Sequence, residues 1–312
     1  MYRNITNPED ACRFMLSLSH VTTSHGKLEL SFYIIIFLLI MFSNITLIYG
    51  LVKTKEIKTN TARLLTALSI GDLLTALVHI PTHITFTHLQ RKSCIGYSME
   101  SFFAVFLGTS ATIITSAMCL DRYLFISRPY KHPKTGTSKY LVIVYLVLAY
   151  SISLSLAISV VIVALSDFGF RLATIFNIIS STIYVLILLT SLVVNTLLYS
   201  YIRNQTKEIK RLSNSHIQQR GYKRKATKTV LIISIIQIFT ITPWVISLIY
   251  MTVEFGEKKY LEYMDTIYYA HVWLRMPVFL NSFFNTIIFM FRNEKLVKFY
   301  KIIVRKYICL HS

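Results

Sequence analysis

The chain of 312 residues has little charge and few residues that interrupt helices. Charged side chains make up 15% of the sequence, whereas soluble domains carry about 25%. Only 6 prolines and 9 glycines are present, so long helices can run without breaks. Hydrophobic residues reach 54%. This composition argues against a soluble enzyme, and also against a disordered chain, which needs low hydrophobicity.

Cysteine is also scarce, and no residues are spaced for metal binding or catalysis. The four cysteines form no Cys-x-x-Cys pair, which argues against a zinc or thioredoxin-like motif and a disulfide-dense secreted fold. The sequence contains neither a metal-spaced histidine set nor a nucleophile elbow. We therefore expect no enzyme activity, no catalytic residues and no metal centre.

Long apolar runs are abundant instead. They lie at about 31–52, 62–87, 97–125, 140–165, 172–202, 229–253 and 266–291. Each is long enough to cross a hydrocarbon core of about 30 Å, which takes roughly 20 helical residues. Seven such runs exceed what one soluble core can bury. The sequence predicts an all-α membrane protein, with a seven-transmembrane helix bundle over 31–291 after an N-terminal tail of residues 1–30.

The positive charges predict how the bundle is oriented. The net charge is +19, and 24 of the 33 Lys and Arg residues fall in 53–63, 122–139, 203–228 and the tail after residue 291. These segments alternate along the chain, so the positive-inside rule places them in the cytoplasm. The predicted N-terminus is then extracellular and the C-terminus cytoplasmic, at the plasma membrane. The charge is a topology signal, so no nucleic-acid partner is expected.

Three features outside the spans predict modification or membrane contact. Residues 292–312 alternate basic and apolar side chains, which predicts an amphipathic helix on the inner leaflet and a short tail. Cys309 behind it is either palmitoylated or an unmodified thiol. Asn4 begins an Asn-Ile-Thr glycosylation sequon in the extracellular tail.

Polar residues inside the spans are functional candidates, because they are costly in lipid. The polar set at mid-depth consists of Asn44, Asp72, Asn281, Ser282 and Asn285. A carboxylate among amides and hydroxyls can hold a cation such as sodium, or ordered water. The alternative is a purely structural polar cluster.

Arg275 is the only formal positive charge in the apolar body of a span. Left alone there it would cost several kcal/mol. It either binds an anionic ligand group or pairs with Glu100, one turn into the third span. The residues placed to line the same cavity are His79, His83, Trp244, Tyr268 and His271.

Several motifs, each in its expected span, resemble those of rhodopsin-like (class A) G-protein-coupled receptors. The third span ends in Asp121-Arg122-Tyr123, followed by Ile126 and Pro129. The other matching positions are Asn44, Leu68, Asp72, Tyr199, Ile202, Pro243, Asn281, Ser282 and Asn285. The seventh-span motif departs from the family at Thr286, where a proline is usual, and at Phe289, where a tyrosine is usual. Ile241 replaces the usual tryptophan, Ser191 the fifth-span proline, and Ala111 the serine of the sodium pocket.

The resemblance implies a receptor that converts extracellular ligand binding into G-protein activation. Arg122, released from Asp121, would help open a cytoplasmic cleft as the sixth span swings about Pro243. Ala104 stands where amine receptors carry an aspartate, and Phe279 where opsins carry their retinal-linking lysine. We therefore expect a small molecule or peptide ligand, not an amine or retinal.

The chain lacks a cysteine at the third-span position where the family forms its extracellular disulfide. Its third-span cysteine would lie at Tyr97, and the nearest cysteine is Cys94, one turn earlier. Either Cys94 pairs with Cys12 in the tail, or both are free thiols.

Two rival functions are weighed against signalling. The changes at Ile241, Thr286 and Phe289 suggest a seven-helix receptor that does not couple to G proteins. A transporter is less well matched, because the spans are unrepeated and continuous.

Overall fold

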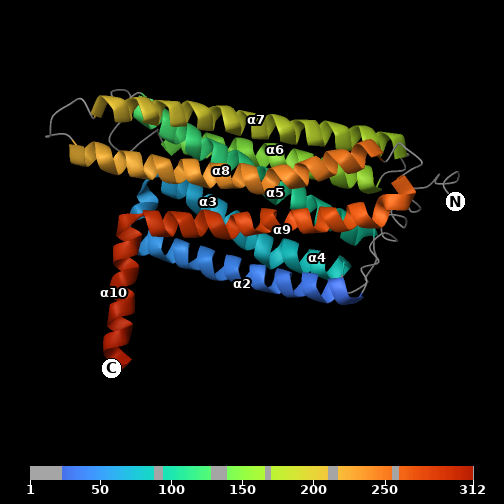
Figure 1. Ribbon diagram of the computed structural model, residues 1–312, viewed down its shortest axis with the longest axis horizontal. Helices are drawn as coiled ribbons and strands as arrows, with labels where there is room; N and C mark the ends of the chain where they lie inside the picture. The colour runs from blue at the N-terminus through green and yellow to red at the C-terminus, as the bar shows by residue number, and fades with distance from the viewer. Residues whose placement is uncertain are drawn as a thin grey trace.

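The computed structural model describes residues 23–87, 94–127, 139–165, 170–209, 217–254 and 260–311, and these residues form helices with no strand (Figure 1). Seven stretches are long and apolar enough to cross a membrane. They lie at Lys27–Lys53, Asn60–Thr85, Ser98–Phe125, Tyr140–Ile162, Ser181–Asn204, Thr227–Ser247 and Trp273–Arg292. The predicted seven-helix bundle is confirmed.

The elements follow the predicted spans closely. The helices are α2 (Thr23–Lys53), α3 (Asn60–Leu74), α4 (Ile80–Thr87), α5 (Cys94–Ser127), α6 (Lys139–Leu165), α7 (Phe170–Ile209), α8 (Ile217–Glu254), α9 (Tyr260–Arg292) and α10 (Glu294–His311). A short 3₁₀ helix, η2 (Glu56–Lys58), joins α2 to α3. Helix α2 begins at Thr23, ahead of the expected span, and this places Glu29 on a helix rather than in the tail.

The second span is a composite of α3, a π-helical segment η3 (Thr75–His79) and α4. The π-helical hydrogen bond runs from the Ile80 N–H to the Thr75 carbonyl. Pro81 follows directly, and a proline ring clashes with the carbonyl four residues earlier in a regular α-helix. The wider π turn relieves this clash, and π segments of this kind are frequent at functional sites.

Helix α5 is the central helix of the bundle. It contacts α3, α4, α6, α7 and α8, while α2 and α7 lie on opposite sides (Figure 1). Large apolar side chains such as Phe42 and Phe239 are about three-quarters exposed and face outward. Apolar residues also fill the interior in two main groups, one around Leu68, Met118 and Val230 and one around Tyr33 and Phe279. A bundle that is apolar both inside and outside suits a lipid surrounding.

Helix α10 runs across the end of the bundle, as Figure 1 shows. Leu296 is fully buried against the core. The Tyr300 hydroxyl donates to the Thr46 carbonyl, and Lys295 forms an ion pair with Glu56. Ile302 and Val304 stay exposed beside the basic side chains. The amphipathic helix expected after the seventh span is therefore present, and two polar contacts hold it to the α2–η2 corner.

Gly50 permits this docking, so its substitution tests the junction. A Cβ at Gly50 would lie 2.6 Å from the Tyr300 Oη and 2.9 Å from Leu296 Cδ2. We expect Gly50→Ala to displace Tyr300, remove its hydrogen bond and lower the free energy of unfolding by about 1 kcal/mol. Gly71→Ala is the matched control, because nothing lies within 4 Å of its Cβ position. Thermal unfolding of the purified protein checks this, and equal stability of the two variants would contradict it.

Candidate functional site

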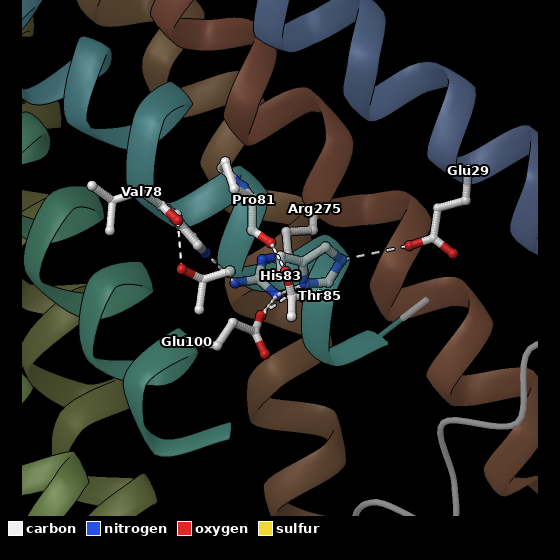
Figure 2. A network of polar contacts seen from close by, with 9 residues as sticks. Glu29, Val78, Pro81, His83, Thr85, Glu100 and Arg275 are labelled. Carbon is white, nitrogen blue, oxygen red and sulfur yellow. Dashed lines mark hydrogen bonds and ion pairs between the residues drawn. The ribbon is translucent and has the colours of Figure 1, made fainter. Parts of the chain in front are cut away.

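The described residues form three levels of polar contacts along the bundle. At the level nearest the start of α2, Arg275 and Glu100 are in contact, with 2.5 Å between Nη1 and Oε1 (Figure 2). The Arg275 Nη2 lies 2.8 Å from His79 Nε2, and His83 Nδ1 lies 2.9 Å from Glu100 Oε1. Glu29 faces the other side of His83, at 3.6 Å from Nε2. The Arg275–Glu100 pairing proposed as one alternative from the sequence is therefore observed.

We call the five polar residues of this level (Glu29, His79, His83, Glu100 and Arg275) the outer cluster. Aromatic rings lie beside them. The Arg275 guanidinium lies 5.7 Å from the centre of the Phe279 ring, within range of a cation–π contact. Phe279 also lies 5.2 Å from the His79 ring. Glu29, Glu100 and both histidines are buried. Four helical segments of the bundle thus meet in one enclosed ionic group.

The middle level connects the first, second and seventh spans. The Ser282 hydroxyl donates to Asp72 Oδ1 at 2.6 Å, and the Thr286 hydroxyl donates to Asn44 Oδ1 at 2.8 Å. The structure therefore brings Asn44, Asp72 and Ser282 of the predicted polar set to one region. Thr286 uses its hydroxyl as a polar partner at the position where the family has a proline.

The middle level also contains oxygen atoms suited to a cation. Four buried oxygens of these spans accept no hydrogen bond from the described residues: Ser69 Oγ, Asp72 Oδ2, Asn281 Oδ1 and Asn285 Oδ1. Hard cations prefer such oxygen ligands. Ser69 and Asp72 are three residues apart on α3, and Asn281 and Asn285 are four apart on α9, so each pair shares a helix face. The donor set fits a sodium ion, although Ala111 offers no hydroxyl.

The inner level lies near the cytoplasmic ends predicted from the sequence. Arg122 Nη2 donates to Thr61 Oγ1, and Thr61 in turn donates to Asp121 Oδ2 at 3.3 Å. Asp121 and Thr61 are buried. Thr61 on α3 therefore joins the two charged residues of the Asp-Arg-Tyr motif through one hydroxyl.

A second contact at this level holds α8 to the end of α9. The Arg292 Nε–H donates to Thr229 Oγ1 at 3.0 Å. Thr229 is buried, and Arg292 is the last residue of α9 before α10 begins. This contact ties the inner half of α8 to the junction with α10.

Polar side chains also join α5, α7 and α8 within the apolar body. Asn195 Nδ2 donates to Ser234 Oγ at 2.5 Å, and the Cys119 thiol donates to Asn195 Oδ1 at 3.2 Å. Gln237 Nε2 donates to Thr112 Oγ1 at 3.3 Å. Each donor and acceptor is buried, and a hydrogen bond between helices satisfies groups that lipid cannot.

Pro243 lies inside α8, one residue before Trp244. Trp244 is buried with its ring 6.1 Å from Tyr184. Ile241, at the usual tryptophan position, is buried in the same apolar group. Trp244 therefore takes part in α7–α8 packing, next to the point where α8 lacks a backbone donor.

The remaining described residues of the family motifs lie outside the three levels of polar contacts. Tyr199 is about half exposed on α7, while Phe289 packs against the core. The aromatic partner of Tyr123 is Tyr201, at 6.2 Å between ring centres. Ala104 is half-buried on α5.

Several predicted sites lie outside the described residues. Asn4, Cys12 and Pro129 fall in segments that the structure does not describe, as do the side chains of Cys94, Tyr268, His271 and Cys309. The disulfide, glycosylation and palmitoylation therefore stay predictions.

Sequence reasoning missed several contact residues, among them Glu29, Thr61, Thr229 and Arg292. Glu29 was placed in the tail because its charge delays the start of the apolar run. Helical periodicity would have found it, since Glu29 precedes the buried Tyr33 by one turn. The two threonines carry no comparable signal, because threonine is common in lipid-facing helices and its partner is set by packing.

Removal of one charge from the outer cluster tests the ion pair. We expect Arg275→Gln to lower stability by about 3–5 kcal/mol, since it leaves buried carboxylates without their cation. Arg275→Gln combined with Glu100→Gln is expected to cost less than Arg275→Gln alone, because neither charge remains. Thermal unfolding of the wild type, both single variants and the double variant gives the coupling energy between Arg275 and Glu100. Arg203→Gln, at an exposed position, is the control. Strictly additive losses would contradict the pairing.

Comparison with known proteins agrees with the fold. Residues 43–289 match the family described as 7 transmembrane receptor (rhodopsin family). Human olfactory receptor 13C5 is 28% identical over 116 residues, which is 36% of each chain. Human olfactory receptor 13C9 is 29% identical over 114 residues, covering 35% of this chain and 36% of the relative. Melanopsin of Phodopus sungorus is 28% identical over 109 residues, covering 34% of this chain and 23% of the relative.

The matched part spans only about a third of the length of the olfactory receptors and less of melanopsin. The family match is far longer and includes all seven spans in part. Because it covers most of the chain, and the structure has the corresponding bundle, this chain belongs to the rhodopsin family of seven-transmembrane receptors.

Proposed function

We propose that this chain is a signalling receptor, not an enzyme, that converts binding of an extracellular ligand into activation of a heterotrimeric G protein. Its N-terminus is extracellular and its C-terminus cytoplasmic in the plasma membrane, as the charge of the connecting segments indicates. The observation that carries the proposal is the inner level, where Arg122 at the end of the central helix is held by Thr61. A hydrogen bond from Arg122 to a neutral hydroxyl can be exchanged for one to another acceptor.

The contacts at the inner level suggest how the cytoplasmic end opens. Helix α8 is fixed there by Arg292 through Thr229. Above this contact, Pro243 removes one backbone hydrogen bond from α8 and provides a bending point. Movement of the inner half of α8 would break the Arg292–Thr229 contact and uncover Arg122. A G-protein segment would then bind in the space beside α5, α7 and α8.

The residues of the outer level argue against an amine or retinal as the ligand. Ala104 has no carboxylate for an amine, and Phe279 is buried beneath Arg275 where a retinal-binding lysine would be required. Arg275 already contacts Glu100 and His79, so the ligand need not be anionic. The name olfactory receptor on two of the relatives favours a small molecule, and a peptide is the alternative.

A receptor that does not couple is the second candidate. Phe289 lacks the hydroxyl of the family tyrosine, and Tyr199 is half exposed rather than facing it. The Thr286–Asn44 hydrogen bond also holds α9 to α2. These observations favour a bundle held in one conformation, whereas transport has no such observation in its favour.

We expect Arg122→Ala to abolish coupling. Membranes containing the wild-type chain and a panel of G proteins should show guanine-nucleotide exchange above membranes without it, and Arg122→Ala should return exchange to that background. Lys27→Ala, exposed at the other end of the bundle, is the control. Equal exchange by wild type and Arg122→Ala at equal surface expression would overturn the role of Arg122. No exchange with any G protein would favour the non-coupling receptor.

We further propose that sodium binds at the middle level, with Asp72, Ser69, Asn281 and Asn285 as its oxygen ligands. Sodium there would supply a positive charge that neutralises Asp72 and stabilises the conformation in which α3 and α9 are close. We expect sodium chloride to raise the thermal unfolding temperature relative to choline chloride, and Asp72→Asn to remove that difference. Glu56→Gln, which changes a carboxylate outside the spans, is the control. The absence of a sodium effect in wild type would contradict the site.

A further inference from the structure

We propose that the outer cluster contains a binding site for an extracellular proton, formed by His83 between Glu29 and Glu100. The ligand is the proton itself, bound as the second N–H of the imidazole ring. The site joins three helices, because Glu29 comes from α2, His83 from α4 and Glu100 from α5. Figure 2 shows His83 at the centre, with the two carboxylates on opposite sides of its ring.

The positions of the ring nitrogens support the charged form of His83. Nδ1 lies 2.9 Å from Glu100 Oε1, and Nε2 lies 3.6 Å from Glu29 Oε1. An ionised carboxylate only accepts hydrogen bonds, and a neutral imidazole has only one N–H. Both nitrogens can face carboxylate oxygens favourably only when both carry a hydrogen. His83 is then an imidazolium.

His79, one helical turn away, has the opposite assignment. Its Nε2 lies 2.8 Å from Arg275 Nη2. A guanidinium only donates, so His79 Nε2 must accept, and the ring is neutral with its hydrogen on Nδ1. Two histidines four residues apart therefore hold different protonation states. Glu100 is the nearer partner of His83 Nδ1, with Arg275 Nη1 farther away at 3.5 Å, whereas the partner of His79 Nε2 is the guanidinium. This contrast makes His79 a matched control for His83.

The described groups around His83 favour a positive charge on its ring. Among the described residues, those facing His83 are Glu29 and Tyr33 from α2, Glu100 from α5 and Arg275 from α9, with His79 one turn away. With His83 charged, two carboxylates are matched by two cations, and Tyr33 and His79 are neutral. Loss of the proton would remove the positive charge that faces these two buried carboxylates, which is costly.

The site is placed to exchange protons with the extracellular solution. Glu29, His83 and Glu100 each lie within about two turns of the end of their helix. Those helix ends belong to the side predicted to be extracellular. Loss of the proton would weaken the contact of α4 with Glu29, and so release α2 from the outer cluster. The effect of this release on signalling rests on the proposed function, whereas proton binding does not.

Thermal unfolding of the full chain in nanodiscs tests the proton site directly. Between about pH 5 and about pH 9, we expect the wild-type unfolding temperature to fall by several degrees as the pH rises, since the stabilising charge is lost with the proton. His83→Gln should be less stable at low pH and should lose this fall. His79→Gln should keep it. His83→Lys provides a cation that does not titrate in this range, so its profile should be flat.

Two results would overturn the proton site. One is a wild-type unfolding temperature that does not fall as the pH rises, and the other is a fall that persists unchanged in His83→Gln. If His83→Gln does not fold, ring-nitrogen NMR of the wild-type chain with isotope-labelled histidine decides. An imidazolium signal assigned to His83 that survives to neutral pH supports the site, and a His83 ring that stays neutral at acidic pH excludes it.

The signalling consequence is measured separately. Cells expressing the chain with a G-protein reporter should respond to a change of external pH, and His83→Lys should remove the response. A reporter that is silent toward pH, together with a His83-dependent unfolding profile, would leave the proton site standing and remove its link to signalling. Silence toward every G protein would instead count against the proposed function.

Discussion

A charge within a membrane protein must be matched inside the protein, and in this bundle Arg275 is matched by Glu100. Hydrocarbon offers neither counter-ions nor hydrogen bonds, so an isolated guanidinium at this depth would be costly. The ion pair fixes α9 against α5, and the histidines of the second span complete it. Glu29 extends the group to α2. The outer ends of the first, second, third and seventh spans are therefore held together by electrostatic contacts. The apolar side chains around them add packing that has no directional preference.

The same requirement organises the other two levels. At the middle level, hydroxyls from α9 donate to Asp72 and Asn44. At the inner level, Thr61 stands between Asp121 and Arg122. At the outer level two full charges face each other, whereas at the inner level threonine hydroxyls mediate the described contacts of Arg122 and Arg292. A hydrogen bond to a hydroxyl is weaker than a charge pair, so the contacts of Thr61 and Thr229 cost less to break than the Arg275–Glu100 pair.

Departures from the family motifs are accommodated by local partners. Thr286 replaces a proline, so α9 keeps a backbone N–H at this position, although Pro277 lies earlier in the helix, and the Thr286 side chain donates to Asn44. Ser191 replaces another proline and lies 3.3 Å from Ser234, next to Asn195. Each change replaces a helix irregularity with a hydrogen bond between helices. The bundle thus keeps its architecture and becomes more polar at its helix contacts.

The sequence by itself determined the seven spans and the helix after them, because length and hydropathy are properties of segments and need no partner. It also predicts their orientation from the charge of the connecting segments. It also gave the Arg275–Glu100 alternative, since a lone buried cation demands a nearby anion. Tertiary structure alone decided that His79 faces the guanidinium while His83 faces Glu29 and Glu100. It likewise decided that Thr61 and Thr229 hold the two arginines. These pairings depend on helix rotation and on the π-helical turn before Pro81, and side-chain packing across the whole bundle sets both.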